Sequence, residues 1–189
     1  MPQVESAAAP ARDRDRRGKI IAAATHLFRE RGFHAVGIDE IGAAAGITGP
    51  GVYRHFSGKD ELLTAVFEGA TDALWRDLDP DAPADLVRYV RSHVAVTVRQ
   101  ADAIQLWYQE GRNLPAAARA SQARLQRRYL ERWVQALLEE RPALAEDEAR
   151  SIVRAAIGLI HSASFNEPTA DPDDLRALLE RLALAVLRA

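Results

Sequence analysis

The sequence predicts an all-α protein of about nine helices in two domains, a three-helix domain at the N-terminus and a helical bundle after it. Apolar residues recur three and four positions apart along most of the 189 residues, as they do on one face of a helix. No stretch alternates apolar and polar residues in the manner of a strand. Prolines, two of them in the segment Asp79–Pro83, divide the pattern into pieces of helical length.

The composition narrows the class of protein. Apolar residues make up 48% of the chain, and no run of about 18 uncharged apolar residues suggests a membrane span. The formal net charge of −2 excludes a nonspecific nucleic-acid coat but leaves a local basic surface possible. The chain has no Cys, which excludes disulfides and thiolate metal sites. The N-terminus lacks the apolar core of a signal peptide, so we expect a cytoplasmic protein.

The first helix follows a small, polar segment at residues 1–11, which we predict to be a disordered tail. Apolar Ile20, Ala24, Leu27 and Phe28 are spaced for one buried helix face. Gly32 marks the end of this helix, because glycine adopts the left-handed conformation without steric cost.

Residues 38–56 predict two short helices joined by a tight turn. Gly46 is placed to end the first helix, Thr48 to cap the second, and Pro50 to lie in its first turn, where a missing N–H does no harm. Gly42 is small where the two helices must cross. This is the spacing of a helix-turn-helix, whose second helix enters a DNA major groove.

The outer face of the second helix distinguishes this motif from an ordinary helical hairpin. It carries small residues with a phenol, a guanidinium and an imidazole, which can approach phosphates and base edges. We expect Tyr53, His55 and Lys59 to contact phosphates, and Arg54 to contact a guanine or a phosphate. Bases would be met by Thr48, Gly49, Pro50 and Gly51. Auxiliary backbone contacts are predicted for Arg16, Arg17 and Gly37, although the two arginines could equally belong to a solvated helix start.

The segments RGKIIAAATHLFRERGFHAV and GIDEIGAAAGITGPGVYRHFSGKDELL, residues 17–63, resemble the N-terminal domain of TetR-family transcriptional repressors. Gly37 departs from the family pattern, which has Thr or Ser capping the first helix of the motif. Backbone N–H groups there would then replace the side-chain contact with phosphate. The resemblance implies a homodimer on a palindromic operator, a hydrophobic effector in the bundle, and a four-helix interface from the last two helices of each subunit.

We therefore expect a helix-turn-helix domain at residues 12–59, a connecting helix at 60–78, and a ligand-binding and dimerisation domain at 79–189. Within the last of these, helices are predicted at residues 85–99, 101–113, 115–141, 145–166 and 172–188.

The last two helices have apolar residues on nearly every side, which requires burial on two sides. One thick bundle could provide this burial, and so could a twin subunit. We predict a dimer interface formed by Ile152, Ala156, Leu159, Ile160, Leu178, Leu182 and Ala185.

The middle helices combine aromatic and charged residues, which could supply the apolar walls and few polar groups of a ligand pocket. Aromatic residues at helical spacing are more often packed in a core. The pocket candidates are Trp107, Tyr108, Arg112, Tyr129, Trp133 and His161, and the mixture favours an amphipathic or acyl-type ligand.

No histidine spacing predicts a metal site, and no nucleotide-binding loop or local nucleophile motif is present. We therefore expect no cofactor and no catalytic residues. The function we expect is that of a ligand-responsive repressor, which a small hydrophobic effector releases from its operator. The sequence equally allows a co-repressor, which would promote operator binding. The alternative is an enzyme or ligand-binding bundle whose helix-turn-helix is only structural, and the enzyme would need Glu110 beside His93 or His161. A nonspecific architectural protein is a third class, which the net charge disfavours.

Overall fold

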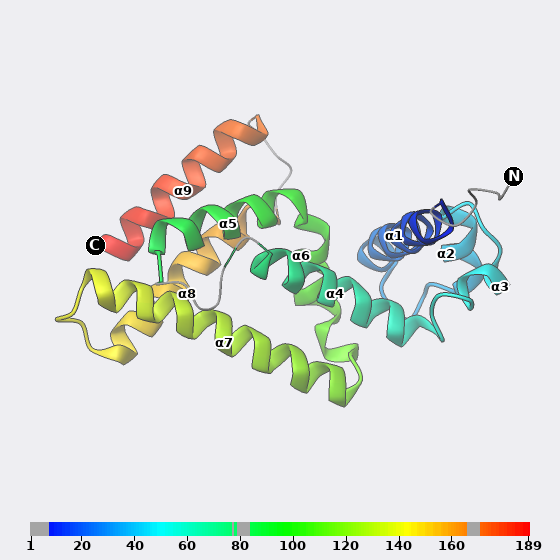
Figure 1. Cartoon of the computed structure of the whole chain (residues 1–189), viewed down its shortest axis with the longest axis horizontal. Coiled ribbons are helices and arrows are strands. Elements are labelled where there is room, and N and C mark those ends of the chain that lie inside the picture. Colours follow the sequence, from blue (N-terminus) through cyan, green and yellow to red (C-terminus); the bar gives the residue numbers. More distant parts are fainter. Residues whose placement is uncertain (1–7, 77, 79–83, 166–170) are drawn as a thin grey trace, which may run out of the picture. The chain divides into compact units, whose positions relative to one another are not determined.

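The computed structural model describes residues 8–76, 78, 84–165 and 171–189, and these residues form nine α-helices, one short 3-10 helix and no strand (Figure 1). The predicted all-α class is therefore confirmed. The helices are α1 (Ala8–Arg31), α2 (Ile38–Ala44), α3 (Gly49–Val52), α4 (Lys59–Trp75), α5 (Leu86–Arg99), α6 (Ala101–Glu110), the 3-10 helix η1 (Gly111–Asn113), α7 (Ala116–Glu140), α8 (Glu146–Ser162) and α9 (Pro172–Arg188). No helix within the described residues is long and apolar enough to cross a membrane.

The chain folds as two compact units that divide it differently from the expected domains. The N-terminal unit comprises the chain up to Phe67 together with Leu106–Pro115, and the bundle unit comprises Glu68–Gln105 and Ala116–Ala189. The expected break at residues 79–83 lies outside the described residues. Both α4 and α6 run from one unit into the other, so a segment far along the chain joins the unit that contains the helix-turn-helix.

The N-terminal unit is built on α1, which begins at Ala8 and so includes residues 8–11 of the predicted tail. Ile20, Ala24 and Phe28 are completely buried on the inner face of α1. Gly32 ends the helix with φ +82°, as its position in the sequence predicts. Helix α2 packs against both α1 and α3 (Figure 1).

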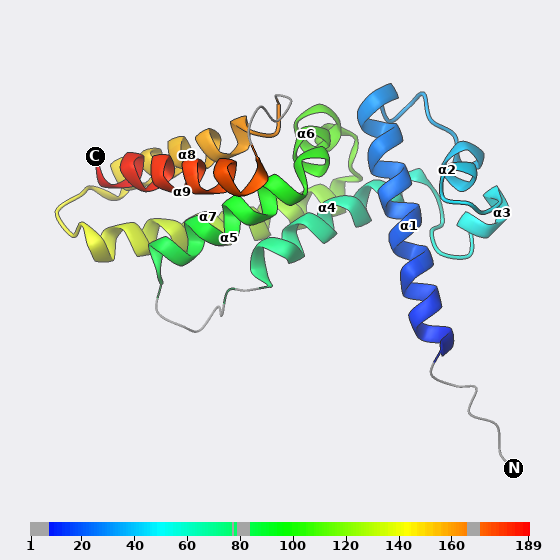
Figure 2. The same ribbon diagram turned by 90° about the horizontal axis from the view of Figure 1, so that it is seen from above.

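The bundle unit is formed by α5, α7, α8 and α9 together with the second half of α4. Helix α8 packs against α7 and α9, and α9 packs against α5 (Figure 2). Trp133 and Leu137 of α7, Val153 and Ile160 of α8, and Leu187 of α9 are completely buried in its core. Burying such large apolar side chains contributes roughly 1.5–3 kcal/mol each to folding.

Candidate nucleic-acid interface and ligand site

The first helix of the motif, α2, is preceded by Gly37, which is its N-cap in extended conformation. The Gly37 N–H donates to Oε2 of Glu40 at 2.8 Å, and Nη1 of Arg31 donates to Oε1 of the same carboxylate at 2.6 Å. These hydrogen bonds lower the pKa of Glu40, the bond from Gly37 first. The predicted phosphate contact at Gly37 therefore has a carboxylate as an internal competitor.

Two glycines determine the geometry of the turn between the two helices of the motif. Gly46 has φ +71°, which confirms it as the left-handed residue that ends α2. Gly42 is buried, and a Cβ added there would lie 3.0 Å from the carbonyl carbon of Thr48 and 3.1 Å from the Gly49 nitrogen. The two helices thus cross through a close backbone contact that favours glycine at this position, as predicted.

Helix α3 starts as predicted but ends earlier. Oγ1 of Thr48 accepts the Gly51 N–H at 3.3 Å, and Pro50 lies in the first turn. The sequence predicts a helix through Phe56, whereas α3 ends at Val52 and a turn follows. The reason is packing: Phe56, only 1% exposed, returns to the core beside the buried Val52.

The predicted DNA contacts differ in accessibility. Thr48, Pro50, Tyr53 and Arg54 are exposed at α3 and the turn after it, and Tyr53 has 57% of its surface accessible. The other exposed predicted contacts are Arg16, Arg17 and Gly37, and Gly51 is half-buried. The Arg17 guanidinium lies over the Phe56 ring, 4.8 Å from its centroid, which places the N-terminal half of α1 beside the motif.

Gly49, expected to meet a base, instead faces α2. It is buried, and a Cβ added to it would lie 1.8 Å from Oδ1 of Asp39. The sequence alone gives no signal for this contact, because it depends on how α2 and α3 cross.

His55 and Lys59, two expected phosphate contacts, have partners within the protein. The His55 side chain is 10% exposed, with Nδ1 3.5 Å from Oδ1 of Asp13. Nζ of Lys59 donates to the Phe33 carbonyl oxygen at 2.8 Å and to that of His34 at 3.4 Å. Both side chains therefore hold the motif against its own unit.

The six predicted pocket residues are divided between the two units. Trp107, Tyr108 and Arg112 belong to the N-terminal unit, where the Trp107 ring meets the Phe67 ring edge-on at 5.0 Å. The other candidates, Tyr129, Trp133 and His161, surround the buried imidazole of His93 in the bundle unit.

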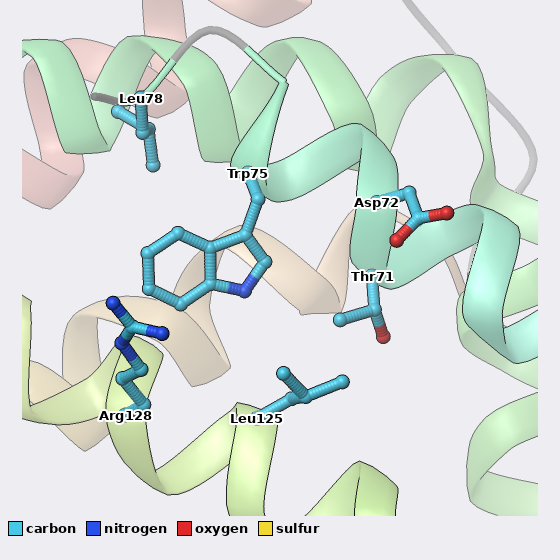
Figure 3. Close-up of a pocket in the computed structure, with 6 residues that line it drawn as sticks. All are labelled: Thr71, Asp72, Trp75, Leu78, Leu125 and Arg128. Atoms are coloured by element: carbon cyan, nitrogen blue, oxygen red, sulfur yellow. The ribbon is translucent and has the colours of Figure 1, made fainter. Parts of the chain in front are cut away.

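A pocket of about 300 Å³ lies between α4 and α7 of the bundle unit (Figure 3). The Arg128 guanidinium lies over the Trp75 ring, 5.5 Å from its centroid. The buried Nε1 of Trp75 has no hydrogen-bond partner among the described residues. The pocket is lined by Thr71, Asp72, Trp75, Leu78, Leu125 and Arg128. Sequence reasoning missed this site because its two walls meet only in the folded bundle.

The residues that an enzymatic site would need belong to different units. Glu110 belongs to the N-terminal unit, where Oε1 accepts the Phe33 N–H at 3.0 Å. His93 and His161 belong to the bundle unit, and their Nε2 atoms lie 2.9 Å apart. Within the described residues, no group of three or more His, Asp or Glu side chains could hold a metal ion.

The predicted dimer residues fall into two sets. Ala156 and Ile160 are completely buried in the core of their own subunit, so neither is on the surface of α8. On α9, Leu178 and Leu182 expose 38% and 40% of their surface, and Ala185 is exposed as well. Ile152 and Leu159 of α8 are half-buried.

Residues 20–66 match the family described as "Bacterial regulatory proteins, tetR family". The chain is 47% identical over 60 residues to the HTH-type transcriptional activator FasR of Mycolicibacterium smegmatis, a match that covers 32% of this chain and 27% of FasR. It is 41% identical over 81 residues to the HTH-type transcriptional repressor Rv3405c of Mycobacterium tuberculosis, covering 42% of this chain and 43% of that protein. The chain thus spans less than half the length of these two relatives.

Solved structures share the fold along most of the chain. A TetR-family transcriptional regulator from Bordetella parapertussis superposes with a TM-score of 0.74 at 20% identity, over 89% of this chain and 93% of the other. AibR, solved in complex with isovaleryl coenzyme A and operator DNA, superposes with a TM-score of 0.70 at 17% identity, over 88% and 97%. At these identities, the likeness shows the fold alone.

Proposed function

We propose that this chain is a TetR-type transcriptional regulator rather than an enzyme, and that it binds a palindromic DNA operator as a homodimer. The observation that supports this most is the exposed surface of α3 on a motif whose inner face is closely packed. Val52 is completely buried while Tyr53, the next residue, is 57% exposed.

We assign the proposed DNA contacts to those residues of the motif that are accessible to solvent. Thr48 and Pro50 would approach base edges and thymine methyl groups, and Gly51 would allow the close approach. Tyr53 and Arg16 would contact phosphates, and Arg54 a guanine or a phosphate. Gly49, His55 and Lys59 would act by packing the motif, because the structure gives each an internal neighbour.

Charge on DNA makes this binding dependent on salt. Each phosphate contact releases condensed counterions, so operator affinity should fall steeply as salt rises. The net charge of −2 for the whole chain keeps nonspecific binding weak and favours selection of one sequence.

Selection of a random duplex library against the purified protein tests the proposal, with the mass of the protein measured in parallel. An enriched palindrome and a dimeric mass are expected. If no sequence is enriched at moderate salt, with or without added acyl compounds, the helix-turn-helix is only structural and the proposed function is wrong.

Ligand control is the second part of the proposal. The pocket between α4 and α7 offers apolar Leu78 and Leu125, the indole N–H of Trp75 and the cation of Arg128, which fit an amphipathic ligand with an anionic group. AibR, which shares the fold, has been crystallised with an acyl coenzyme A. A bound ligand would shift α4 and change the spacing of the two recognition helices, which must match successive major grooves about 34 Å apart.

The direction of regulation depends on which state the ligand prefers. A ligand that binds better to the DNA-incompetent state releases the operator, and one that prefers the DNA-bound state is a co-repressor. The relatives include one described as an activator and one described as a repressor.

Tryptophan fluorescence tests the pocket with octanoate and isovaleryl coenzyme A as probes. We expect saturable quenching that Arg128→Gln weakens and that Arg127→Gln, a change of the same charge at the neighbouring exposed residue, leaves intact. Equal binding by both variants would remove Arg128 from the site.

A further inference from the structure

The second half of α6 and the 3-10 helix after it are part of the unit that contains the helix-turn-helix. Leu106 is completely buried there, and Leu114 is 3% exposed. The Trp107 ring packs edge-on against Phe67. Residues 106–115, which we call the docking segment, are therefore integral to the core of the N-terminal unit.

Glu110 of the docking segment holds the turn that follows α1. Its Oε1 accepts the N–H of Phe33 at 3.0 Å, across 77 residues of sequence. Its Oε2 accepts from the side-chain amide of Asn113, which fixes the orientation of the carboxylate. Phe33 follows Gly32, whose φ of +82° takes the chain out of the helix, so Phe33 N–H is the first backbone donor after the turn begins.

The other side of the same residue is held from α4. Nζ of Lys59 donates to the Phe33 carbonyl oxygen at 2.8 Å and lies 4.8 Å from the centroid of the Phe33 ring. The ring itself is buried against Phe28 at 5.2 Å. An acid from α6 and a base from α4 thus hold the two backbone polar groups of Phe33, four residues before the motif begins at Gly37.

We propose that Glu110 is a positioning residue for DNA binding: by accepting the Phe33 N–H, it fixes the turn between α1 and α2 and hence the presentation of the helix-turn-helix. This inference rests on the proposed function. The docking segment is covalently continuous with the bundle unit, where the Gln105 side chain donates to the Ser164 carbonyl oxygen and α7 begins at Ala116.

Because Glu110 is negatively charged, a positioning role and a purely electrostatic effect predict opposite changes in operator affinity when it is replaced. Removing a negative charge from a DNA-binding unit should, by electrostatics alone, strengthen binding to phosphates. A positioning role predicts the opposite, because Glu110→Ala leaves the Phe33 N–H without its acceptor and loosens the turn. Glu110→Gln keeps an oxygen acceptor of nearly the same size and should retain the position.

The experiment measures operator affinity across a salt series for the full-length protein and its variants. We expect about tenfold weaker binding by Glu110→Ala, the order of effect of one lost hydrogen bond that is partly buried, and near-wild-type binding by Glu110→Gln. The slope of affinity against salt should stay unchanged, because no phosphate contact is lost. Glu139→Ala, the same charge change at an exposed site on α7, is the control and should not weaken binding.

Amide hydrogen exchange at Phe33 provides a readout that is independent of DNA. The Phe33 N–H should be protected in the wild-type protein, and its exchange should accelerate in Glu110→Ala but not in Glu139→Ala. An unprotected Phe33 N–H in the wild type overturns the proposal even if Glu110→Ala fails to fold. Equal or tighter operator binding by a folded Glu110→Ala also overturns it.

The two proposals fail in different ways. If the wild-type protein binds no duplex, the proposed function is wrong and Glu110 has no role in DNA binding, whatever the protection of Phe33. If the wild type binds an operator and Glu110→Ala binds it equally well, only the positioning role is wrong.

Discussion

The Nε2 atoms of His93 on α5 and His161 on α8 lie 2.9 Å apart inside the bundle unit, with the two rings stacked. A hydrogen bond between two such nitrogens requires one to carry a proton and the other to be bare, so at most one of the two imidazoles can be charged. The hydroxyl of Tyr129 lies 3.2 Å from Nδ1 of His93. Burial lowers the pKa of His161 to about 4 and, with the neighbouring His161, lowers that of His93 well below its ordinary range.

This pair predicts that the protein loses stability in mild acid. The unfolded chain binds protons on these histidines near pH 6.5, whereas the folded chain resists them to about pH 4 for His161. The stability that neutral His161 contributes is therefore fully present above pH 6.5. It declines as the pH falls from 6.5 to about 4, and it is constant below about pH 4. His161 alone should lower the free energy of unfolding by about 2 kcal/mol between pH 7 and pH 5.

Urea unfolding at the two pH values measures this loss. His161→Gln should show a weaker pH dependence, and His34→Gln, at an exposed site, should match the wild type. The paired carboxylates Glu40 and Glu61 have pKa values lowered from 4.5, so they stay ionised in the folded protein at pH 5. They therefore add little to the difference in unfolding free energy between pH 7 and pH 5. The same unfolding free energy at pH 7 and pH 5 would contradict the prediction.

Tyr53→Ala should weaken operator binding by about tenfold while leaving helicity and dimer mass intact, because it removes an exposed side chain proposed to touch phosphate. Tyr108 is a matched control, since both tyrosines expose 57% of their surface in the N-terminal unit. Gel-shift titration decides: equal affinities for the two alanine variants would remove Tyr53 from the interface.

Gly42→Ala should destabilise the motif more than Gly49→Ala. The new Cβ at position 42 meets backbone atoms of Thr48 and Gly49 at 3.0–3.1 Å, so the backbone of the turn must shift by a few tenths of an ångström to admit it. At position 49, the closest atom is the end of the Asp39 side chain, which can rotate away, so Asp39→Ala should relieve that variant.

Thermal unfolding and operator affinity together measure the two glycine effects. Gly69→Ala is the control, because its Cβ would meet nothing within 4 Å and alanine favours an exposed helix by about 0.5–1 kcal/mol. If Gly42→Ala were as stable as Gly69→Ala, the close helix crossing would be refuted.

Leu182→Arg should convert the proposed dimer to a monomer, since it places a charge on the exposed apolar face of α9. Light scattering reports the mass, and Ala120→Arg, at an exposed site on α7, is the control. A stable Leu182→Arg dimer would move the interface elsewhere on the chain.

The sequence by itself determined the helical fold and the local geometry of the helix-turn-helix. Gly46, Thr48 and Pro50 have the conformations predicted for them, because a turn and a helix cap depend on neighbours within a few residues. Apolar spacing likewise identified the buried face of α1, which includes Ile20 and Phe28.

Only the tertiary structure decided which side chains remain available for partners. Lys59 has the residue type of a phosphate contact, yet it is bound to the Phe33 carbonyl, and Glu110 reaches Phe33 from 77 residues away. Ile160 belongs to an apolar helix surface by its sequence, yet it is completely buried in its own subunit. The physical reason is that periodicity and capping arise from local contacts, whereas the partner of a long side chain depends on how distant helices pack.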